Sequence, residues 1–385
     1  MAIRKSPRGS RLLIAENVAG GGAFAFLHDG ARVLSRKRVR VKTGLVCGPG
    51  FVDLQCNGFA GVDFNRRETE PVVIAGAIRA MWEHGCTEVL PTFITAPPDA
   101  LDEYLGDMVK ALATDREAAA SVPGFHLEGP FISPKDGARG AHPVAHVRPV
   151  DRRLWRRWQR VAAGRIGLVT LAPEVTGAME FIRELRREKV LPAIGHTLAD
   201  AACVRAAADA GAMMSTHLGN GCPRMLPRHE NVIFAQLAEE RLAASFIADG
   251  VHLPAETLRV LWRARGPEKC MLVTDAIAAA GAPPGIYSIG ELTVEVGADR
   301  VVRQPGQPYL AGSALTMNDA VAGLVNMTGM PLADAWDAAS RRPWDLLRKA
   351  GAVRGRPRSE IVARWRGGRL EVLAAFRGNR VLWAK

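Results

Sequence analysis

The chain has 385 residues, of which 48% are hydrophobic and 23% are charged. This apolar content excludes a disordered chain, and no apolar run reaches the roughly 18 residues that a membrane-spanning helix needs. The 51 Lys and Arg outnumber the 39 Asp and Glu, which gives a net charge of +12. Because such an excess is typical of proteins with a polyanionic partner, nucleic-acid binding has to be weighed against the motifs below.

The first residues and the cysteines indicate the cell compartment. The basic start, Met1 to Ser10, is not followed by the continuous apolar segment of a secretion signal. The six cysteines are scattered without a Cys-x-x-Cys pair, as expected for reduced thiols. We therefore expect a cytoplasmic protein that is not inserted in a membrane.

Eight short β-type runs alternate with helical stretches from residue 48 onward. The alternation predicts parallel strands joined by crossover helices, and eight such units in about 300 residues predict an α/β fold, the (β/α)8 TIM barrel. The predicted strands are Gly50–Asp53, Glu88–Pro91, Gly124–Leu127, Gly167–Leu171, Leu191–Gly195, Met213–Thr216, Ala243–Ala248 and Met271–Thr274. Predicted helices between them include Val72–His84, Ala178–Glu188, Ala199–Ala210 and Ala255–Arg265.

The two ends of the chain have a different pattern. Residues 1–47 contain short β-type runs such as Arg38–Val41, and residues 350–385 end in runs that alternate in the same style. We expect both termini to join in one small β-sandwich domain, 1–47 with 350–385, beside a barrel that spans 48–349.

Polar residues stand at or just past the C-terminal ends of the predicted strands, where a TIM barrel carries its active site. Glu128, His196 and His217 follow the third, fifth and sixth strands. One carboxylate and two imidazoles suit a catalytic ion of the zinc type, which keeps an open position for water. Each residue alone could be a buried structural His or a capping Glu, but the three together predict a metal site.

Two more residues are candidates for catalysis. Asp275 ends the last strand, where a carboxylate could take a proton from metal-bound water and pass it to a leaving amine. The alternative for Asp275 is a helix N-cap. His252 follows the seventh strand and could donate to a carbonyl oxygen that becomes an oxyanion, the alternative being a surface loop His.

These residues lie in motifs that resemble the N-acetylglucosamine-6-phosphate deacetylase family, metal-dependent enzymes of the amidohydrolase superfamily. The resemblance runs from about Gly48 to Leu347. Its motifs are GPGFVDLQCNG (Gly48 to Gly58), GCTEVLPTFIT (Gly85 to Thr95), HLEGPF (His126 to Phe131), VTLAPE (Val169 to Glu174), GHT (Gly195 to Thr197), THLGN (Thr216 to Asn220), ADGVH (Ala248 to His252), LVTDA (Leu272 to Ala276) and LAGSALTM (Leu310 to Met317).

The resemblance implies a TIM barrel with a small β domain, a homodimer, and removal of the N-acetyl group of an amino sugar. The first expectation is N-acetylglucosamine 6-phosphate, which would give glucosamine 6-phosphate and acetate. By position, the resemblance implies these roles: metal ligands Glu128, His196 and His217; general base and acid Asp275; carbonyl polarisation His252; substrate binding His142, Asn220 and Gly221.

Two positions bear on the number of metal ions. Many amidohydrolases hold a second ion with His-x-His at the end of strand 1 and a carboxylated Lys after strand 4. Here the strand-1 positions are Gln55 and Asn57, and Ala172-Pro173-Glu174 follows strand 4. Because amides are weak neutral ligands, we predict one divalent ion per subunit, zinc first and iron, cobalt or manganese as alternatives.

The loop after His217 departs from the family pattern. The resemblance implies an Arg that reaches the substrate phosphate, often that of the neighbouring subunit. Aligning Glu230 puts His229 at that position, with Arg228 one residue earlier. The case for a 6-phosphate therefore depends on Arg224 or Arg228 as a substitute. The alternative substrate is an unphosphorylated or differently modified N-acyl amino sugar.

Two other functions remain as alternatives. Nucleic-acid binding rests on net charge alone, and we interpret the excess as Arg spread over helices and the β domain, so neither a nucleic acid nor a membrane is expected as a partner. A ring-opening hydrolase such as a dihydropyrimidinase would need the absent His-x-His and bridging Lys.

Overall fold

The computed structural model describes residues 9–305 and 310–385. Residues 1–8, part of the predicted small domain and of the start that was examined for a secretion signal, lie outside the described residues. Among the helices of the described part, none combines the length and apolar character needed to cross a bilayer.

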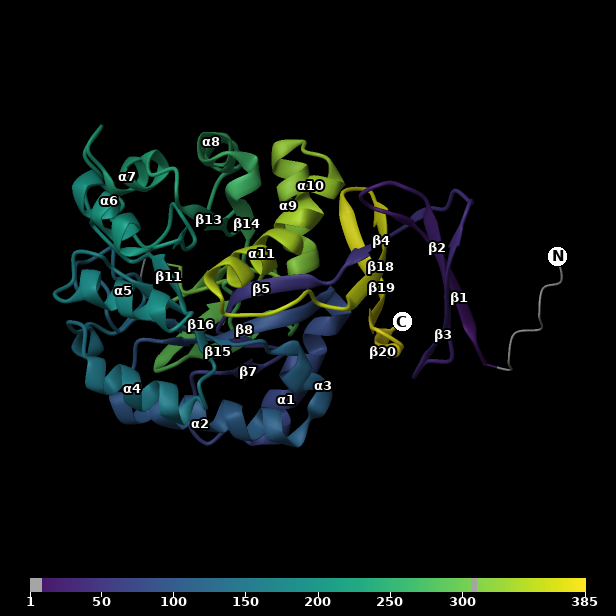
Figure 1. Ribbon diagram of the computed structural model, residues 1–385, viewed down its shortest axis with the longest axis horizontal. Helices are drawn as coiled ribbons and strands as arrows, with labels where there is room; N and C mark the ends of the chain where they lie inside the picture. The colour runs from purple at the N-terminus through teal and green to yellow at the C-terminus, as the bar shows by residue number, and fades with distance from the viewer. Residues whose placement is uncertain (1–8, 306–309) are drawn as a thin grey trace.

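Eight parallel strands form the barrel, and each pairs with the next in the chain (Figure 1). All eight predicted strands are confirmed, with ends that differ by a few residues, so the predicted fold class is correct. The strands are β5 (Phe51–Cys56), β8 (Cys86–Ile94), β9 (Phe125–Glu128), β10 (Ile166–Leu171), β11 (Leu191–Ile194), β12 (Met214–Ser215), β13 (Ala243–Phe246) and β14 (Cys270–Leu272).

The barrel closes where the segment after β14 meets β5. The backbone N–H of Asp275 donates to the carbonyl of Gln55 at 2.9 Å, and that of Asn57 donates to the carbonyl of Ala276 at 2.7 Å. Inside the barrel, the Thr274 hydroxyl donates to the buried Asp53 carboxyl at 2.5 Å. These bonds bring the ends of the first and last strands together, which places residues 55 and 57 beside residue 275.

Helices surround the barrel and bury apolar faces against it (Figure 1). Side chains of Asp115, Asp151, Asp200 and Asn231 cap the N-termini of α3, α4, α6 and α7. The helices are α1 (Pro71–Ala80), α2 (Pro98–Thr114), α3 (Arg116–Ser121), α4 (Arg152–Val161), α5 (Ala178–Arg187), α6 (Ala201–Ala210), α7 (Val232–Ala238), α8 (Ala255–Arg265), α9 (Met317–Thr328), α10 (Leu332–Ala338) and α11 (Arg341–Ala350), with 3₁₀ turns at Met81–His84, Val144–His146 and Pro267–Lys269.

A three-stranded antiparallel sheet, absent from the sequence prediction, is inserted after β14. It consists of β15 (Gly285–Ile289), β16 (Leu292–Val296) and β17 (Val302–Arg303). The buried carboxyl of Asp63 accepts hydrogen bonds from the Ser288 hydroxyl and the Gly290 N–H, and so ties this sheet to the barrel rim. Asp63 itself belongs to a short hairpin of β6 (Gly58–Phe59) and β7 (Val62–Asp63).

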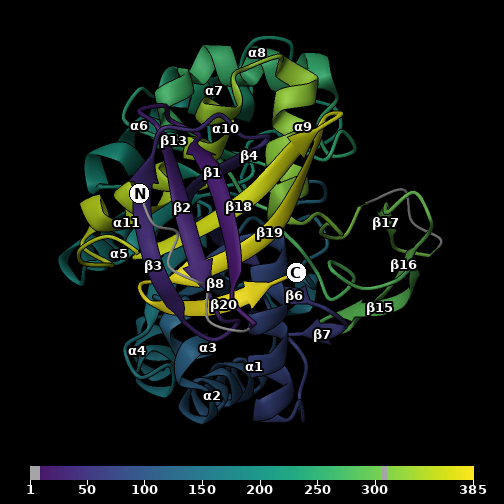
Figure 2. The ribbon, with the colours of Figure 1, turned by 90° about the vertical axis from the view of Figure 1, so that its right-hand side faces the viewer.

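Both termini build a seven-stranded sheet with the order β20-β19-β18-β4-β1-β2-β3 (Figure 2). Although three strands separate β2 from β19 in this order, the rings of Phe26 and Phe376 stack at 5.3 Å. The sheet therefore folds over its own core, as a sandwich does. Its strands are β1 (Arg11–Asn17), β2 (Ala23–His28), β3 (Val33–Val39), β4 (Leu45–Pro49), β18 (Ser359–Arg366), β19 (Arg369–Arg377) and β20 (Arg380–Ala384).

Candidate active site

A cavity of about 570 Å³ opens at the C-terminal ends of the barrel strands. Ile289 and Leu292 of the inserted sheet form part of its wall. Most of the predicted site residues line it: Asn57, Glu128, His142, His196, His217, Asn220, Gly221, Arg224, His252 and Asp275.

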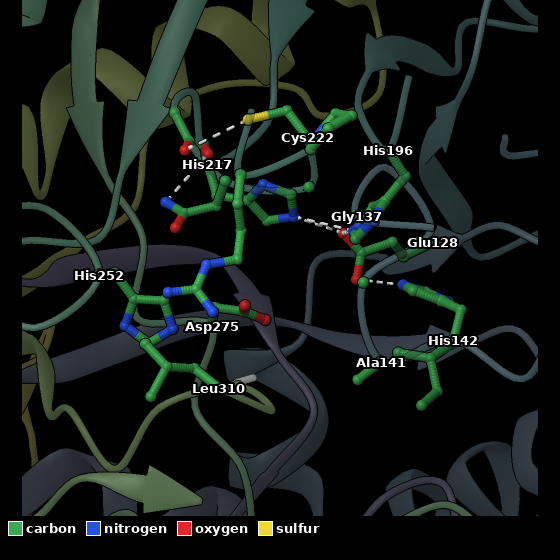
Figure 3. A pocket seen from close by; sticks show the side chains of 18 of the residues that line it. Glu128, Gly137, Ala141, His142, His196, His217, Cys222, His252, Asp275 and Leu310 are labelled. Carbon is green, nitrogen blue, oxygen red and sulfur yellow. Dashed lines mark hydrogen bonds and ion pairs between the residues drawn. The ribbon is translucent and has the colours of Figure 1, made fainter. Parts of the chain in front are cut away.

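Glu128, His196 and His217 converge in one buried cluster at the cavity wall (Figure 3). Glu128 Oε1 lies 3.0 Å from His217 Nε2 and 3.3 Å from His196 Nε2. The two Nε2 atoms are 3.1 Å apart. Barrel closure thus brings together three side chains that are far apart in the sequence.

The donor set of this cluster fits a small divalent cation. His196 Nδ1 lies 2.9 Å from the carbonyl of Ala138, which can only accept, so Nδ1 donates there and Nε2 is the ring nitrogen that faces Glu128 and His217. Burial alone would raise the pKa of Glu128, but the hydrogen bonds with His196 and His217 hold it well below its usual value. A carboxylate and two imidazole nitrogens within 4.8 Å of one another are of the kinds that bind a metal ion in catalytic zinc-type sites.

The backbone at the site is strained. His196, His217 and Asp275 have φ values of 50°, 30° and 50°, in the left-handed region that side-chain-bearing residues rarely adopt. Each residue lies two or three positions after the end of a strand, so the chain turns sharply there and aims the side chain into the cavity. Opposite them, a Cβ atom at Gly221 would lie 3.1 Å from His196 Nδ1 and 3.2 Å from His217 Cε1, which explains why glycine stands there.

The side-chain amides of Gln55 and Asn57 donate hydrogen bonds to the carboxylates of Glu128 and Asp275. Gln55 Nε2 lies 2.8 Å from Glu128 Oε1 and 3.2 Å from Asp275 Oδ1, and Asn57 Nδ2 lies 2.8 Å from Asp275 Oδ1. The hydroxyl of Thr216 donates to Gln55 Oε1 at 2.8 Å and thereby fixes the orientation of this amide. An N–H group therefore stands between the two carboxylates.

Asp275 is half-buried and lines the cavity. Burial, and after it the charge of Glu128, raises the pKa of Asp275 above its usual value. A cation held by Glu128 would offset the second effect. An Asp that can both hold and release a proton is suited to general base and acid chemistry.

Two histidines face the cavity from opposite sides of the cluster (Figure 3). His252 Nδ1 lies 2.7 Å from Asp249 Oδ2, which leaves Nε2 for the cavity. His142 Nδ1 lies 2.8 Å from the Thr95 hydroxyl, and its Nε2 lies 3.8 Å from Glu128 Oε2. Because burial lowers the pKa of His142 to about 3, this ring is neutral near pH 7 and acts as a hydrogen-bonding group rather than as a cation.

The basic residues of the loop after His217, which are candidates for binding an anionic substrate group, differ in their position relative to the cavity. Arg224 lines the cavity, and its side chain forms no hydrogen bond or ion pair with any described residue. Arg228 and His229 are exposed and do not line the cavity. Of the two Arg that were considered for an anionic substrate group, Arg224 is therefore the one that the fold places at the cavity.

The roles of the residues that orient the site were not predicted from the sequence, although Asp249 was noted at the end of the seventh strand. Asp249, Thr95 and Thr216 each fix the orientation of a side chain that faces the cavity. The contact of Asp249 with His252 could have been predicted, because Asp249 precedes His252 by three residues in ADGVH, a spacing at which both side chains can meet in a turn. Thr95 and Thr216 gave no signal, since their partners His142 and Gln55 are distant in the sequence.

Comparisons with known proteins agree with this geometry. The model of the amidohydrolase family matches residues 47–353. The human N-acetylglucosamine-6-phosphate deacetylase is 37% identical over 79% of this chain and 75% of its own length. An N-acetylgalactosamine-6-phosphate deacetylase from Shewanella sp. (strain ANA-3) is 30% identical over 85% of this chain and 88% of its own.

A solved structure has nearly the same extent. The N-acetyl-D-glucosamine-6-phosphate deacetylase of Mycobacterium smegmatis, an Asp-to-Ala variant in complex with N-acetyl-D-glucosamine-6-phosphate, is 28% identical. It covers 97% of this chain and 99% of its own length, with a TM-score of 0.81. The chain therefore belongs to the amidohydrolase family and, within it, to the group of the N-acetylglucosamine-6-phosphate deacetylases.

Proposed function

We propose that this protein hydrolyses the N-acetyl group of N-acetylglucosamine 6-phosphate to give glucosamine 6-phosphate and acetate. The observation that carries the proposal is the convergence of Glu128, His196 and His217 with Asp275 at one cavity. The relatives named above act on N-acetyl hexosamine 6-phosphates of two sugar types, which supports the substrate class.

One divalent ion per subunit, with zinc as the first choice, would be held by Glu128, His196 and His217. When bound, it supplies Lewis-acid chemistry by polarising the acetyl carbonyl and by making its water more acidic. The Gln55 amide N–H between the two carboxylates supports a single ion, because it satisfies the oxygens that a second ion would need.

The protein's own groups would carry the proton and the developing charge. Asp275 accepts the proton of the attacking water, while the Asn57 and Gln55 amides hold its carboxylate in place. In its doubly protonated form, His252 donates from Nδ1 to Asp249 and from Nε2 to the carbonyl oxygen as negative charge forms there. Asp275 then gives its proton to the amine nitrogen, so that the C–N bond breaks and acetate leaves.

The test is acetate release by the purified, metal-loaded protein. We expect kcat/KM to be highest for N-acetylglucosamine 6-phosphate, compared with N-acetylgalactosamine 6-phosphate and unphosphorylated N-acetylglucosamine. A preference for the free sugar would instead support the alternative substrate, and turnover of none of the three would contradict the proposal.

Arg224 is proposed to contact the phosphate. Replacing it with Gln is expected to raise KM for the 6-phosphate by about 10- to 100-fold, the loss of one charge-assisted hydrogen bond, and to leave the free sugar unchanged. Arg228→Gln is the matched control, since Arg228 lies on the same loop outside the cavity. Equal effects on phosphorylated and free sugar, or a larger effect of Arg228→Gln, would contradict this role.

The prediction of one ion per subunit can be tested by measuring the metal content. We expect about one equivalent of zinc, iron, cobalt or manganese per chain by elemental analysis of the purified protein. The exchange Gln55→His with Asn57→His restores the His-x-His pair and is expected to raise the bound metal above one equivalent. Two equivalents in the unmodified protein would contradict the mononuclear assignment.

Three further expectations are proposed with the function. A homodimer and a cytoplasmic location stay expectations, and the boundaries 1–47 with 350–385 and 48–349 stay the proposed domain division. Equilibrium sedimentation of the purified protein tests the homodimer.

A further inference from the structure

The inserted sheet contributes two side chains to the cavity wall through one face of the hairpin that β15 and β16 form. Ile289 and Leu292 are direct partners in this hairpin, and both line the cavity. The next pair, Ser288 and Thr293, points to the opposite face because side chains alternate along a strand, and it lines a second cavity behind the hairpin. The position of the hairpin therefore sets the position of this part of the wall.

The apolar side chains of the inserted sheet form a small cluster that is separate from the barrel core. This cluster consists of Ile94, Ile277, Ala279, Ile289, Val294, Val296, Val302, Ala311 and Ala314. A segment with few buried apolar contacts opens at a lower cost in free energy than a core strand does. The position of the hairpin therefore depends strongly on the polar contacts that hold it.

The buried carboxylate of Asp63 in β7 holds the hairpin close to its turn, and Figure 2 shows β7 beside β15. Asp63 Oδ2 accepts from the Ser288 hydroxyl at 3.0 Å and from the Gly290 N–H at 2.8 Å, so it contacts both residues that flank Ile289. Burial raises the pKa of Asp63 to about 6, against the opposing effect of its hydrogen bonds. Asp63 is therefore ionised at about pH 8, where its two oxygens only accept.

The chain around Asp63 is fixed to the catalytic end of the barrel. The Phe64 N–H donates to the carbonyl of Asn57 at 2.9 Å. The side chain of Asn65 accepts from the N–H of Ile94 at 2.8 Å. Because Asn57 and Ile94 both line the cavity, Asp63 ties the hairpin to backbone that already borders the site.

A local role in its own turn does not account for the contacts of Asp63. Asp63 Oδ1 accepts from the Asn65 N–H at 2.8 Å, which is the usual contact of an Asp in a turn. Oδ2 is not needed for that turn, yet it binds Ser288, which is 225 residues away in the sequence. The second oxygen therefore indicates a role in placing the hairpin.

We propose that Asp63 is a positioning residue for substrate binding, which holds the hairpin so that Ile289 and Leu292 form an apolar wall against which the N-acyl amino sugar packs. The inference rests on the proposed function, because it concerns where that substrate binds. An acyl group and the C–H groups of a sugar ring are apolar, so they suit such a wall. Asp63 itself does not line the cavity, so its replacement should change KM rather than kcat.

The main test is Asp63→Asn in the zinc-loaded protein at about pH 8. The amide keeps the volume of the side chain but turns one acceptor oxygen into an NH2 group, which cannot accept from an N–H. If the hairpin then keeps its position only about a tenth of the time, KM for N-acetylglucosamine 6-phosphate rises about 10-fold with little change in kcat. Hydrogen exchange of residues 285–296 should become at least about 10-fold faster, while exchange in the barrel strands stays the same.

Variants of the hairpin test the same mechanism from the other side. Ser288→Ala removes one of the two bonds to Asp63, so it should raise KM and exchange less than Asp63→Asn does. Leu292→Ala shortens the wall and should raise KM at least about 10-fold without faster exchange. Together with Asp63→Asn, it should raise KM by less than the product of the single effects, because both changes act on one wall. Thr293→Ala, on the opposite face of the hairpin, is the matched control and should change neither quantity.

Normal KM and unchanged exchange of residues 285–296 in Asp63→Asn would overturn the proposal. So would faster exchange throughout the barrel with a normal KM, since that would show a role in overall stability alone. If Asp63→Asn fails to fold, Ser288→Ala decides the matter, and normal KM and exchange in that variant would refute the proposal. A protein that deacetylates no sugar, but whose hairpin exchanges faster in Asp63→Asn, would refute the proposed function and leave the role of Asp63 in placing the hairpin standing.

Discussion

Asp275→Asn is expected to lower kcat by at least about 10³-fold while the protein keeps its metal. Asp275 is the proposed acceptor of the water proton and its donor to the amine, and each such transfer is worth about 10²- to 10⁴-fold. An Asn side chain can occupy the same volume and the same backbone, because Asn tolerates the left-handed φ of 50° found here. Steady-state kinetics with elemental analysis of the same sample measures both quantities.

The controls for this variant address the surrounding hydrogen bonds. Asn57→Ala removes one donor to Asp275 and keeps the carboxylate, so it should lose much less activity than Asp275→Asn. Near-normal turnover by Asp275→Asn would show that another group transfers the proton. Loss of the metal in that variant would mean that Asp275 is needed for binding and not for proton transfer alone.

The barrel could be predicted from the sequence because the patterns that indicate its strands and helices are local. Each buried strand is a short β-type run followed by an amphipathic helix, and all eight runs became strands. The metal cluster then followed from topology, since residues just after parallel strands meet on one face whatever their separation in the chain. Glu128, His196 and His217 could be grouped in this way without knowing any distance.

The wall of the cavity was harder to predict. The inserted sheet was missed, although Gly285–Ile289 and Leu292–Val296 flank a two-residue turn at Gly290-Glu291 that is typical of a hairpin. The direction of the Gln55 amide could not be predicted, because it depends on Thr216, which is distant in the sequence. The sequence also did not show which Arg of the loop after His217 lies at the cavity. The structure places Arg224 there and Arg228 outside it.

Replacing a ligand of the proposed ion should have the other large effect. His196→Asn is expected to lower the metal affinity by more than about 100-fold, because the shorter Asn side chain cannot reach the cluster of Glu128 and His217. Loss of a residue that only hydrogen-bonds a ligand costs up to about 100-fold, and loss of a ligand itself should cost more. Asn again tolerates the φ of 50° at this position, so the backbone is not strained further. Without the ion, the carbonyl loses its main polarising group, and activity should fall by at least about 10³-fold.

A thermal unfolding series separates metal loss from misfolding. A ligand that binds only the folded state stabilises it by about 2.7 kcal/mol at 100 times its Kd, so zinc should raise the Tm of the unmodified apoprotein. The same zinc should leave the Tm of His196→Asn nearly unchanged, whereas His146→Asn, a His outside the cluster, should respond like the unmodified chain. An equal zinc response in all three proteins would place the ion elsewhere. A low Tm of His196→Asn before any zinc is added would indicate that the imidazole is needed for the fold, through its bond to the carbonyl of Ala138.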